Sequence, residues 1–563
     1  MSLSNVQFSI LDYSFFVIVF FVSILIGLYF ARKSKKDGKN TVDEYFFGGK
    51  KMEVIPVAFS LVATSVTGSS TIGLSMEVYA YGLHTWMYIV IIPIWGLVMH
   101  YIFLRIFYDL QLDSSFTYLE MRFDKSVKQF ASALYVISGF FVMPLMIYTP
   151  ALCFQEVTGI NLYVTAIVTG LLCVLYTVIG GIKAVVWTDL FQCVLIFGSS
   201  IVILVVGLNS VGGLYKVWEA LERGGRSTTL KTEFDFEIRG STWAYLFSTI
   251  FIIIYQCGMS QSSVQRFSSL PTYTKALQAL WFQVFLFMLA LMLEILIGAI
   301  IYANYEDCDP LSAGFVRKLD QVFAHFVQGK ASVFNGFTGV FVAGVFAAGL
   351  STMSSILNTV SGTIYVDFLS KSMVNYSEKT INRTVKIIVT IVGVVTIALI
   401  FLIEHLGTIF AISLKCLTVS TVGIFGLFIN GMLFPRINSK GAKCGVAVSM
   451  LVVGILILGG INKSPDPMLP LRIDNCDIAN ITSNASNSTL YEKIANEVNP
   501  NKDIPWIFRV NFQFHCIIGL IVSITVGYII SGLTGWNEVR DERLLVSFLR
   551  KNIPKDVLLT NKQ

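Results

Sequence analysis

Hydroxyl groups and main-chain oxygens are the groups in this sequence whose spacing favours ligand binding. Ala348, Ser351 and Thr352 stand at positions i, i+3 and i+4, so they share one face of a helix. The stretch 64–71, TSVTGSST, is equally rich in hydroxyls. Facing each other, the two segments would form an oxygen cage without a carboxylate, which suits weak binding of a small monovalent cation. The same hydroxyls could instead bond to their own helix or to a neighbouring one.

The elements that carry these groups are apolar segments of membrane-spanning length. Residues 54–82 would form a helix about 42 Å long, and the apolar core of a bilayer is about 30 Å thick. The small polar centre at 64–71 predicts a break in this helix, which is tolerated in a membrane only inside protein or beside a wet cavity. The alternative is that small residues let two unbroken helices pack closely. Segment 243–263 carries a similar irregular polar patch, YQCGMSQ, at 255–261.

Composition identifies the class of protein. The chain has 563 residues, of which 55% are hydrophobic and 13% charged, and its mean hydropathy is +0.70. Soluble domains carry about 25% charged residues, so we predict a multi-pass membrane protein. Five scattered histidines and nine cysteines without a CxxC spacing give no metal cluster or nucleophile–base pair. We therefore expect no enzyme activity, no cofactor other than a coupling ion, and no nucleic-acid partner.

The predicted fold is an all-α integral membrane fold with 13 transmembrane helices. The apolar segments lie at 13–31, 54–82, 85–110, 128–155, 161–180, 187–208, 243–263, 276–303, 337–367, 385–405, 407–434, 443–461 and 511–533. With the N-terminus extracellular and the C-terminus cytoplasmic, most Lys and Arg residues fall in loops on the inside, as is usual. We expect this orientation in the plasma membrane.

The two interrupted segments divide the chain into repeats. They are the second and the seventh segment, and this odd offset predicts two five-helix units inverted relative to each other, at 54–208 and 243–434. The remaining divisions are an N-terminal part (1–53), an extracellular loop (209–242), the last two helices with their long loop (435–534) and a cytoplasmic tail (535–563).

The loops on the predicted outside carry two further signals. The glycosylation sequons at Asn480, Asn484 and Asn487 cluster in loop 462–510. Cys308 and Cys476 are both extracellular in this arrangement, so we expect a disulfide between them, with two free thiols as the alternative.

Motifs in a fixed order resemble a known family. EYFFGGKK at 44–51 resembles an EYF-x-GGR motif, GGIKAVVWTDLFQ at 180–192 resembles GG-x-x-AV-x-x-TD-x-x-Q, and Gln261, Gln265 and Arg266 also agree. Over residues 10–535 the chain thus resembles the sodium/solute symporter family, closest to its sodium-dependent multivitamin and monocarboxylate branch. The resemblance implies the amino-acid symporter fold with its inverted five-helix repeat.

The resemblance also implies site residues. Sodium would bind to the carbonyls of Ala63, Val66 and Ala348 and to the hydroxyls of Ser351 and Thr352. The substrate would lie beside Ser69, Ser70, Tyr255, Gln256 and the segment 407–434. Asp189 occupies a position near the cytoplasmic exit of sodium. Read by itself, Asp189 could equally be an interfacial residue that caps a helix.

Charged residues inside apolar segments are functional candidates by default. Lys415 lies in LGTIFAISLKCLTVSTVG, where the related branch usually has small uncharged residues, and residues 421–423 also depart from that pattern. Our hypothesis is that Lys415 pairs with a substrate carboxylate; the alternatives are snorkelling to the interface or pairing with a structural acid such as Glu77. Glu77 and Glu294 are candidates for gate residues or for structural pairs.

These features predict a secondary active transporter in the lipid bilayer. It would couple inward sodium flow to uptake of a small organic anion, either a vitamin such as biotin or pantothenate or a monocarboxylate. The alternatives are symport of an iodide-like inorganic anion, and a sensor or channel without coupled uptake.

Overall fold

A computed structural model describes residues 9–36, 42–112, 114–228, 230–330, 335–405, 409–460, 463, 466–476, 504–537 and 541–550. Within these ranges every regular element is a helix. The N-terminal half contains α1 (Ile10–Lys36), α2 (Val42–Phe47), α3 (Val54–Ser65), α4 (Gly68–Tyr81), α5 (Met87–Val98), α6 (Leu104–Leu110), α7 (Thr117–Arg122), α8 (Lys125–Thr158), α9 (Leu162–Val211) and α10 (Leu214–Arg223).

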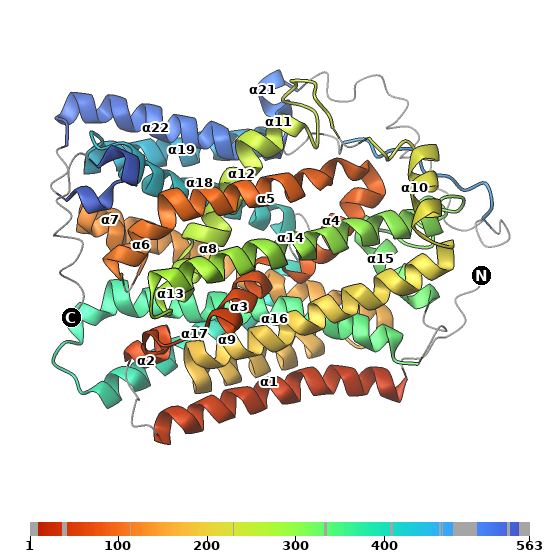
Figure 1. The fold of residues 1–563 in the computed structure, drawn as a ribbon, viewed down its shortest axis with the longest axis horizontal. Coiled ribbons are helices and arrows are strands. Elements are labelled where there is room, and N and C mark those ends of the chain that lie inside the picture. Colours follow the sequence, from red (N-terminus) through yellow and green to blue (C-terminus); the bar gives the residue numbers. More distant parts are fainter. Residues whose placement is uncertain are drawn as a thin grey trace.

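The second half continues in the same way. It contains α11 (Thr242–Ala244), α12 (Ile250–Ile253), the π-helical turn η5 (Ile254–Met259), α13 (Gln261–Ser268), α14 (Tyr273–Asn304), α15 (Leu319–Gly329), α16 (Phe337–Thr363), α17 (Glu378–His405), α18 (Ile409–Leu433), α19 (Ser439–Gly459), α21 (Trp506–Arg509) and α22 (His515–Thr534). The long helices lie roughly parallel, as Figure 1 shows.

The described residues contain ten helices that are long and apolar enough to cross a membrane, or eleven if α3 and α4 together form one bent span. The prediction of an all-α membrane fold is therefore confirmed. The number of 13 crossings stays a prediction, and it would require that α9 be two crossings and that α18 be a further one.

Helix α9 is a hairpin of two antiparallel arms. As a straight rod its 50 residues would measure about 75 Å, far more than a bilayer core. The backbone breaks at Gly181, with φ 59° and ψ −158°. On α16, Gly344 lies beside Ser199 and Ser355 bonds to Asp189, whereas Leu350, between them, accepts from Tyr176 of the first arm. Both arms therefore lie along the same stretch of α16.

Glycine is required at this turn. A Cβ on Gly181 would approach the carbonyl oxygen of Tyr45 at 2.7 Å, and its positive φ is unfavourable for other residues. The hydroxyl of Tyr45 in turn donates to the Thr177 carbonyl at 3.0 Å. The turn in α9 is thus fixed by α2.

Helix α16 lies at the centre of the bundle. It packs against α9, α8, α1, α17 and α3, and nearly all its side chains are buried. Helix α1 lies at the edge, with Val17, Phe21, Leu25 and Tyr29 among its exposed large side chains. Such an exposed apolar surface suits contact with lipid.

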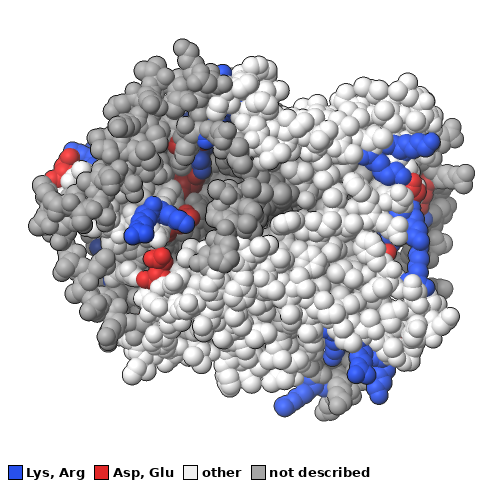
Figure 2. All heavy atoms as spheres, turned by 180° about the vertical axis from the view of Figure 1, so that it is seen from behind, with Lys and Arg blue, Asp and Glu red and all other residues white. Residues whose placement is uncertain are grey.

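Charged side chains gather toward the ends of the bundle (Figure 2). Helices α10 and α15 lie at one end, on the right of Figure 1, and we call this the disulfide end because Cys308 and Cys476 are joined there. Helices α2, α7 and α13 lie at the other end, the basic end. In Figure 2, seen from behind, Lys and Arg gather at the right-hand edge and a broad uncharged belt covers the middle.

Candidate ion- and solute-binding site

The first interruption lies between α3 and α4. Helix α3 ends at Ser65, Val66 and Thr67 are extended, and α4 starts at Gly68 at an angle of 54° to α3. Thr67 and Ser70 form a capping box: the Thr67 hydroxyl accepts from the Ser70 amide, and the Ser70 hydroxyl accepts from the Thr67 amide, both at 2.9 Å. The hydroxyl-rich sequence therefore starts a new helix instead of continuing the old one.

The second interruption lies at Ser260. The π-helical turn η5 ends at Met259, Ser260 is extended, and α13 begins at Gln261. The Ser260 hydroxyl accepts from the Ser263 amide at 3.3 Å and so caps the new helix. The prediction that both polar patches interrupt their helices is confirmed.

Helix α16 meets the first interruption through its hydroxyl face. The Ser351 hydroxyl donates to the Ala63 carbonyl at 2.8 Å, and the Thr352 hydroxyl donates to the Thr64 carbonyl at 3.3 Å. Both hydroxyls also reach the Ala348 carbonyl at 3.1 Å. Four of the five expected sodium ligands are thus linked to one another by a chain of hydrogen bonds. Val66, the fifth, is the buried extended residue that follows α3.

This cluster offers neutral oxygens only. Each hydroxyl oxygen keeps lone pairs when its hydrogen is donated, and carbonyls at the end of α3 are released from regular helix bonding. Such an arrangement of hard oxygen ligands can hold a small monovalent cation without a fixed counter-charge.

Asp189 lies in a buried network directly beside this cluster. Its Oδ2 accepts from Ser60 at 2.6 Å, from Arg266 at 3.1 Å and from Ser355 at 3.3 Å. Asp189 and Arg266 have side-chain exposures of 0% and 1%, so the ion pair is shielded from solvent. Asp189 lies inside α9, and therefore does not cap a helix start.

Ser355 connects the network to the hydroxyl cluster. Its hydroxyl lies 3.0 Å from that of Thr64, whose carbonyl accepts from Thr352. Arg266 also donates to Ser355 and, at 2.7 Å, to Ser60 on α3. The network therefore links α3, α9, α13 and α16, the elements that surround both interruptions.

The expected substrate residues are not brought together by hydrogen bonds in the described part of the chain. Tyr255 is buried with its ring 6.1 Å from that of Phe425 on α18. Gln256 is exposed, and its carbonyl accepts from the hydroxyls of Ser260 and Ser263. Ser70 is used in the capping box. The side chains of Ser69 and Lys415 lie outside the described residues, as do Asn480, Asn484 and Asn487.

Reasoning from the sequence missed Arg266, Ser60 and Ser355 as members of the site. Arg266 is present in the family motif, and a lone arginine among serines next to an apolar segment signals a buried acidic partner. Ser60 and Ser355 gave no such signal, because serines are common in packed membrane helices.

A second cluster of charged residues lies at the disulfide end. Arg239 binds Glu77 through two hydrogen bonds of 2.8 and 2.6 Å, and His84 lies 3.4 Å from the same carboxylate. Burial opposes the charge on Arg239, but the hydrogen bonds and charge of Glu77 outweigh it and raise the pKa of Arg239. Arg239 also lies 3.5 Å from Asp466. Glu77 is thus paired with a loop arginine.

Glu294 is a buried acid within the long helix α14. Its Oε1 accepts from the Thr71 hydroxyl at 2.9 Å, and its carbonyl accepts from Ser75. Both contacts join α14 to α4 just beyond the first interruption.

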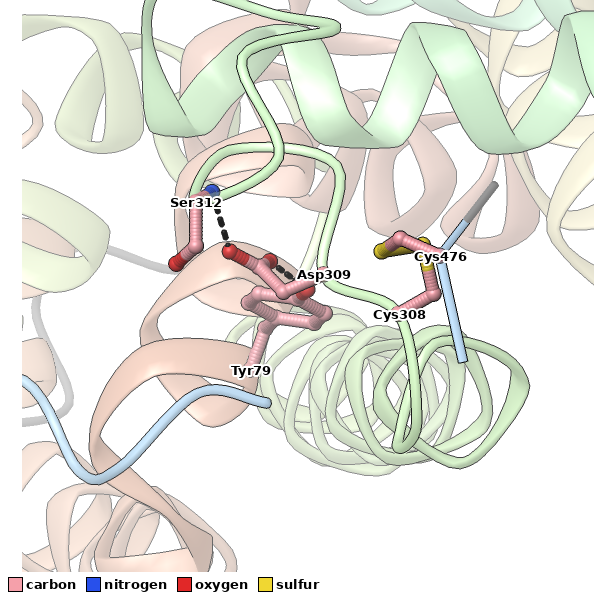
Figure 3. Close-up of a disulfide and its surroundings, with 5 residues drawn as sticks. All are labelled: Tyr79, Cys308, Asp309, Ser312 and Cys476. Atoms are coloured by element: carbon pink, nitrogen blue, oxygen red, sulfur yellow. Dashed lines mark hydrogen bonds between the residues drawn. A yellow bond between two sulfur atoms is a disulfide. The ribbon is translucent and has the colours of Figure 1, made fainter. Parts of the chain in front are cut away.

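The disulfide lies close to the end of α4 (Figure 3). Asp309, next to Cys308, accepts from the Tyr79 hydroxyl and from the Ser312 amide at 2.6 Å. Asp309 also donates its amide to the Arg472 carbonyl at 2.8 Å, close to Cys476. Three segments far apart in the sequence are therefore fastened together at this end.

Comparison with known sequences gives one family. The model of the sodium:solute symporter family matches residues 45–449. The chain is 29% identical to sodium-coupled monocarboxylate transporter 2 of Bos taurus over 95% of its own length and 86% of the relative's. It is 27% identical to the sodium-dependent multivitamin transporter of Oryctolagus cuniculus, over 94% and 83% of the two chains.

The fold of the chain is similar to that of a solved structure. A Na⁺-coupled sialic acid symporter in a substrate-bound, outward-open state superposes with a TM-score of 0.75. The match covers 94% of this chain and 99% of the other at 20% sequence identity.

Proposed function

The chain belongs to the sodium:solute symporter family, and from this premise we propose that it couples inward sodium flow to uptake of a small organic anion by alternating access. The observation that carries this proposal is the meeting of the α16 hydroxyls with the broken end of α3. Sodium binds there, to Ala63, Val66, Ala348, Ser351 and Thr352. Because the ligands are neutral, binding is weak enough for release in every cycle.

Asp189 provides the route by which sodium leaves toward the basic end. Its Oδ1 and both amide atoms of Gln192, one turn later, are buried and have no hydrogen-bond partner among the described residues. A passing ion with its water would satisfy these atoms, which otherwise cost free energy. Departure of the ion also frees the hydroxyls of Ser351 and Thr352 to bond the α3 carbonyls, which joins α16 to α3 without the ion.

The organic anion binds between the two interruptions, beside Ser69, Ser70, Tyr255, Gln256 and Lys415. The names of the related transporters supply the substrate class, a monocarboxylate or a vitamin. Biotin and pantothenate are the vitamins that we propose as candidates. The basic end faces the cytoplasm of a plasma membrane, which places the N-terminus, the disulfide end and glycosylated Asn480, Asn484 and Asn487 outside.

Uptake in cells that express the full chain tests this function. Labelled biotin, pantothenate, lactate, iodide and glucose are compared in sodium buffer and with choline in place of sodium. We expect saturable uptake of an organic anion that disappears in choline. Sodium-dependent uptake of iodide alone would replace the organic anion by an inorganic one, and ligand binding without uptake would indicate a sensor.

The sodium ligands are tested in the same assay. Ser351→Ala with Thr352→Val removes two expected ligands, so the sodium concentration for half-maximal uptake should rise tenfold or more, equivalent to about 1.4 kcal/mol. Ser23→Ala with Thr396→Val is the matched control, since among the described residues these buried hydroxyls bond only to their own helices or to a neighbouring sulfur. Equal sodium dependence of the two double variants would contradict the proposed ion site.

The role of Lys415 is a separate prediction. If its ammonium group pairs with the substrate carboxylate, Lys415→Gln should raise the KM for the transported anion about tenfold or more and change sodium dependence little. Lys440→Gln removes an equal charge from an exposed position and should leave KM unchanged. An unchanged KM in Lys415→Gln would reject the pairing.

A further inference from the structure

A cavity of about 600 Å³ opens on the outside of the bundle at the basic end, away from the hydroxyl cluster. It lies between the end of α1, the start of α3 and the second arm of α9. Leu25, Ile26 and Phe30 form its apolar part, and Lys33, Lys51 and Lys183 contribute cations. We propose that this cavity binds an anionic phospholipid of the surrounding membrane leaflet.

The cavity changes from apolar to charged along the direction expected for a lipid. Leu25 and Lys33 are both on α1, eight residues apart, which corresponds to about 12 Å along the helix axis. The apolar residues thus lie toward the middle of the bundle and the lysine at its end. A phospholipid has the same order, because its apolar acyl chains lie toward the middle of the membrane and its phosphate lies at the surface.

Aromatic rings form the wall at the level between the two regions. Phe30 on α1 stacks on Trp187 of α9 with ring centroids 5.9 Å apart, and Lys33 lies over the ring of Tyr29 at 5.9 Å. Aromatic side chains prefer this interfacial depth, where an apolar face and a polar edge are both satisfied. The wall therefore places the glycerol region of a lipid beside Trp187.

Charge in the cavity favours an anion. Lys183 is paired with Glu44, whereas Lys51 has no ion pair with another described residue and is exposed. Three lysines against Glu44 and Glu53 leave the lining with one excess positive charge. Lys33 and Lys51 come from two different elements, so a phosphate between them would join α1 to the segment that leads into α3.

The position of this cavity connects it to the transport machinery. Trp187 lies two residues before Asp189, and Glu53 directly precedes α3, whose Ser60 bonds to Asp189. A lipid bound here would therefore contact both α9, which carries Asp189, and the start of α3, which carries Ser60. The inference depends on membrane insertion and not on the identity of the transported solute.

Native mass spectrometry of the purified full chain tests the proposal. Dioleoylphosphatidylserine is added to delipidated protein in detergent, and dioleoylphosphatidylcholine, with the same chains but no net charge, is the comparison lipid. We expect at least threefold higher occupancy of phosphatidylserine, and a threefold or greater loss of it in Lys33→Gln with Lys51→Gln. Lys125→Gln with Lys440→Gln removes two exposed lysines at the same end outside the cavity and should retain the lipid.

Three outcomes would overturn the inference. Equal occupancy by the two lipids would mean that the lysines do not select an anion. Equal retention of phosphatidylserine by the two double variants would remove the cavity as the place of binding. Displacement of the lipid by an equal concentration of glycerophosphoserine, which lacks acyl chains, would make the cavity a site for soluble phosphate esters.

Discussion

The residue pair Asp189–Arg266 is an ion pair shielded from solvent within the helix bundle. Both side chains are buried, and three serines bond to them: Ser60, Ser262 and Ser355. The two charges balance each other only while both are present, since an isolated buried charge is very costly. The pair thus joins α9 to α13, the helix that begins at the second interruption.

Charge removal at this pair gives a prediction at the residue scale. Arg266→Gln and Asp189→Asn should each destabilise the protein by about 3–5 kcal/mol, because each leaves one buried charge uncompensated. The double variant restores neutrality and should be more stable than either single variant, while sodium-dependent uptake stays low. Thermal unfolding in detergent and uptake measure the two effects.

The double variant also shows whether the charges of Asp189 and Arg266 interact energetically or only lie close together. A stability loss equal to the sum of the two single losses would show that the charges do not interact. Recovery of full uptake in the double variant would remove Asp189 from the proposed sodium route.

At the scale of elements, the interruptions are created by caps. A hydroxyl at Thr67 and another at Ser260 accept from amides at the start of a new helix, so each new helix is stabilised at its first turn. At the first interruption the carbonyls of Ala63 and Thr64 then accept from α16 instead of from the next turn of their own helix. Capping chemistry therefore prepares the ion site.

The Thr67 cap can be separated from the ion site by a matched pair of variants. Thr67→Ala should cost about 0.5–2 kcal/mol of stability and also weaken sodium activation of uptake, since the start of α4 beside the ion site is no longer capped. Thr272→Ala removes the cap of α14, whose Lys275 amide bonds to the Thr272 hydroxyl at 3.3 Å. It should lose stability only. Equal sodium activation in both variants would contradict the link between cap and site.

The turn in α9 is a second element with a sharp requirement. Gly181→Ala should lower the yield of folded protein and its melting temperature, because an added Cβ meets the Tyr45 carbonyl and the positive φ is strained. Gly198→Ala lies on the second arm of α9, where a Cβ meets nothing within 4 Å, and should be neutral or slightly stabilising. Size-exclusion yield and thermal unfolding distinguish the two. Similar behaviour would mean that α9 tolerates a different turn.

At the scale of the whole molecule, loops at the disulfide end are bonded to one another and to the end of α4. The first interruption lies at the opposite end of the same helix. Cys308 and Cys476 are 168 residues apart in sequence, and Tyr79 of α4 bonds to Asp309 beside the bridge. The salt bridge from Glu77 to Arg239 fixes the same end of α4 to another loop. These contacts fasten the end of α4 to two loops.

Loss of the disulfide bridge should lower the stability of the whole protein. Cys308→Ser with Cys476→Ser should lower stability by a few kcal/mol, because the bridge restricts a long segment of the unfolded chain. Reductant should lower the melting temperature of the unmodified protein and leave that of the variant unchanged. Cys444→Ser, at an exposed free thiol, is the control and should have no effect. A melting temperature insensitive to reductant would show that the bridge does not stabilise the protein.

The sequence by itself determined the membrane class, the family and the two interruptions. Apolar length, low charge and hydroxyl-rich breaks act locally, so each is readable from neighbouring residues at 64–71 and 255–261. The face shared by Ala348, Ser351 and Thr352 follows from helix periodicity alone. Their grouping with Ala63 was expected from the family motif, and the structure brings these four residues together.

Only the tertiary structure decided the partners. Arg266 with Asp189, Arg239 with Glu77 and Thr71 with Glu294 join residues 77 to 223 positions apart. Spacing along the chain carries no information on such pairs, because their distance is set by how whole helices cross. The two apolar segments at 161–180 and 187–208 were expected as separate crossings, and the structure adds that both arms of α9 lie along α16. Local patterns therefore determined which elements exist, and long-range packing determined which charges neutralise one another.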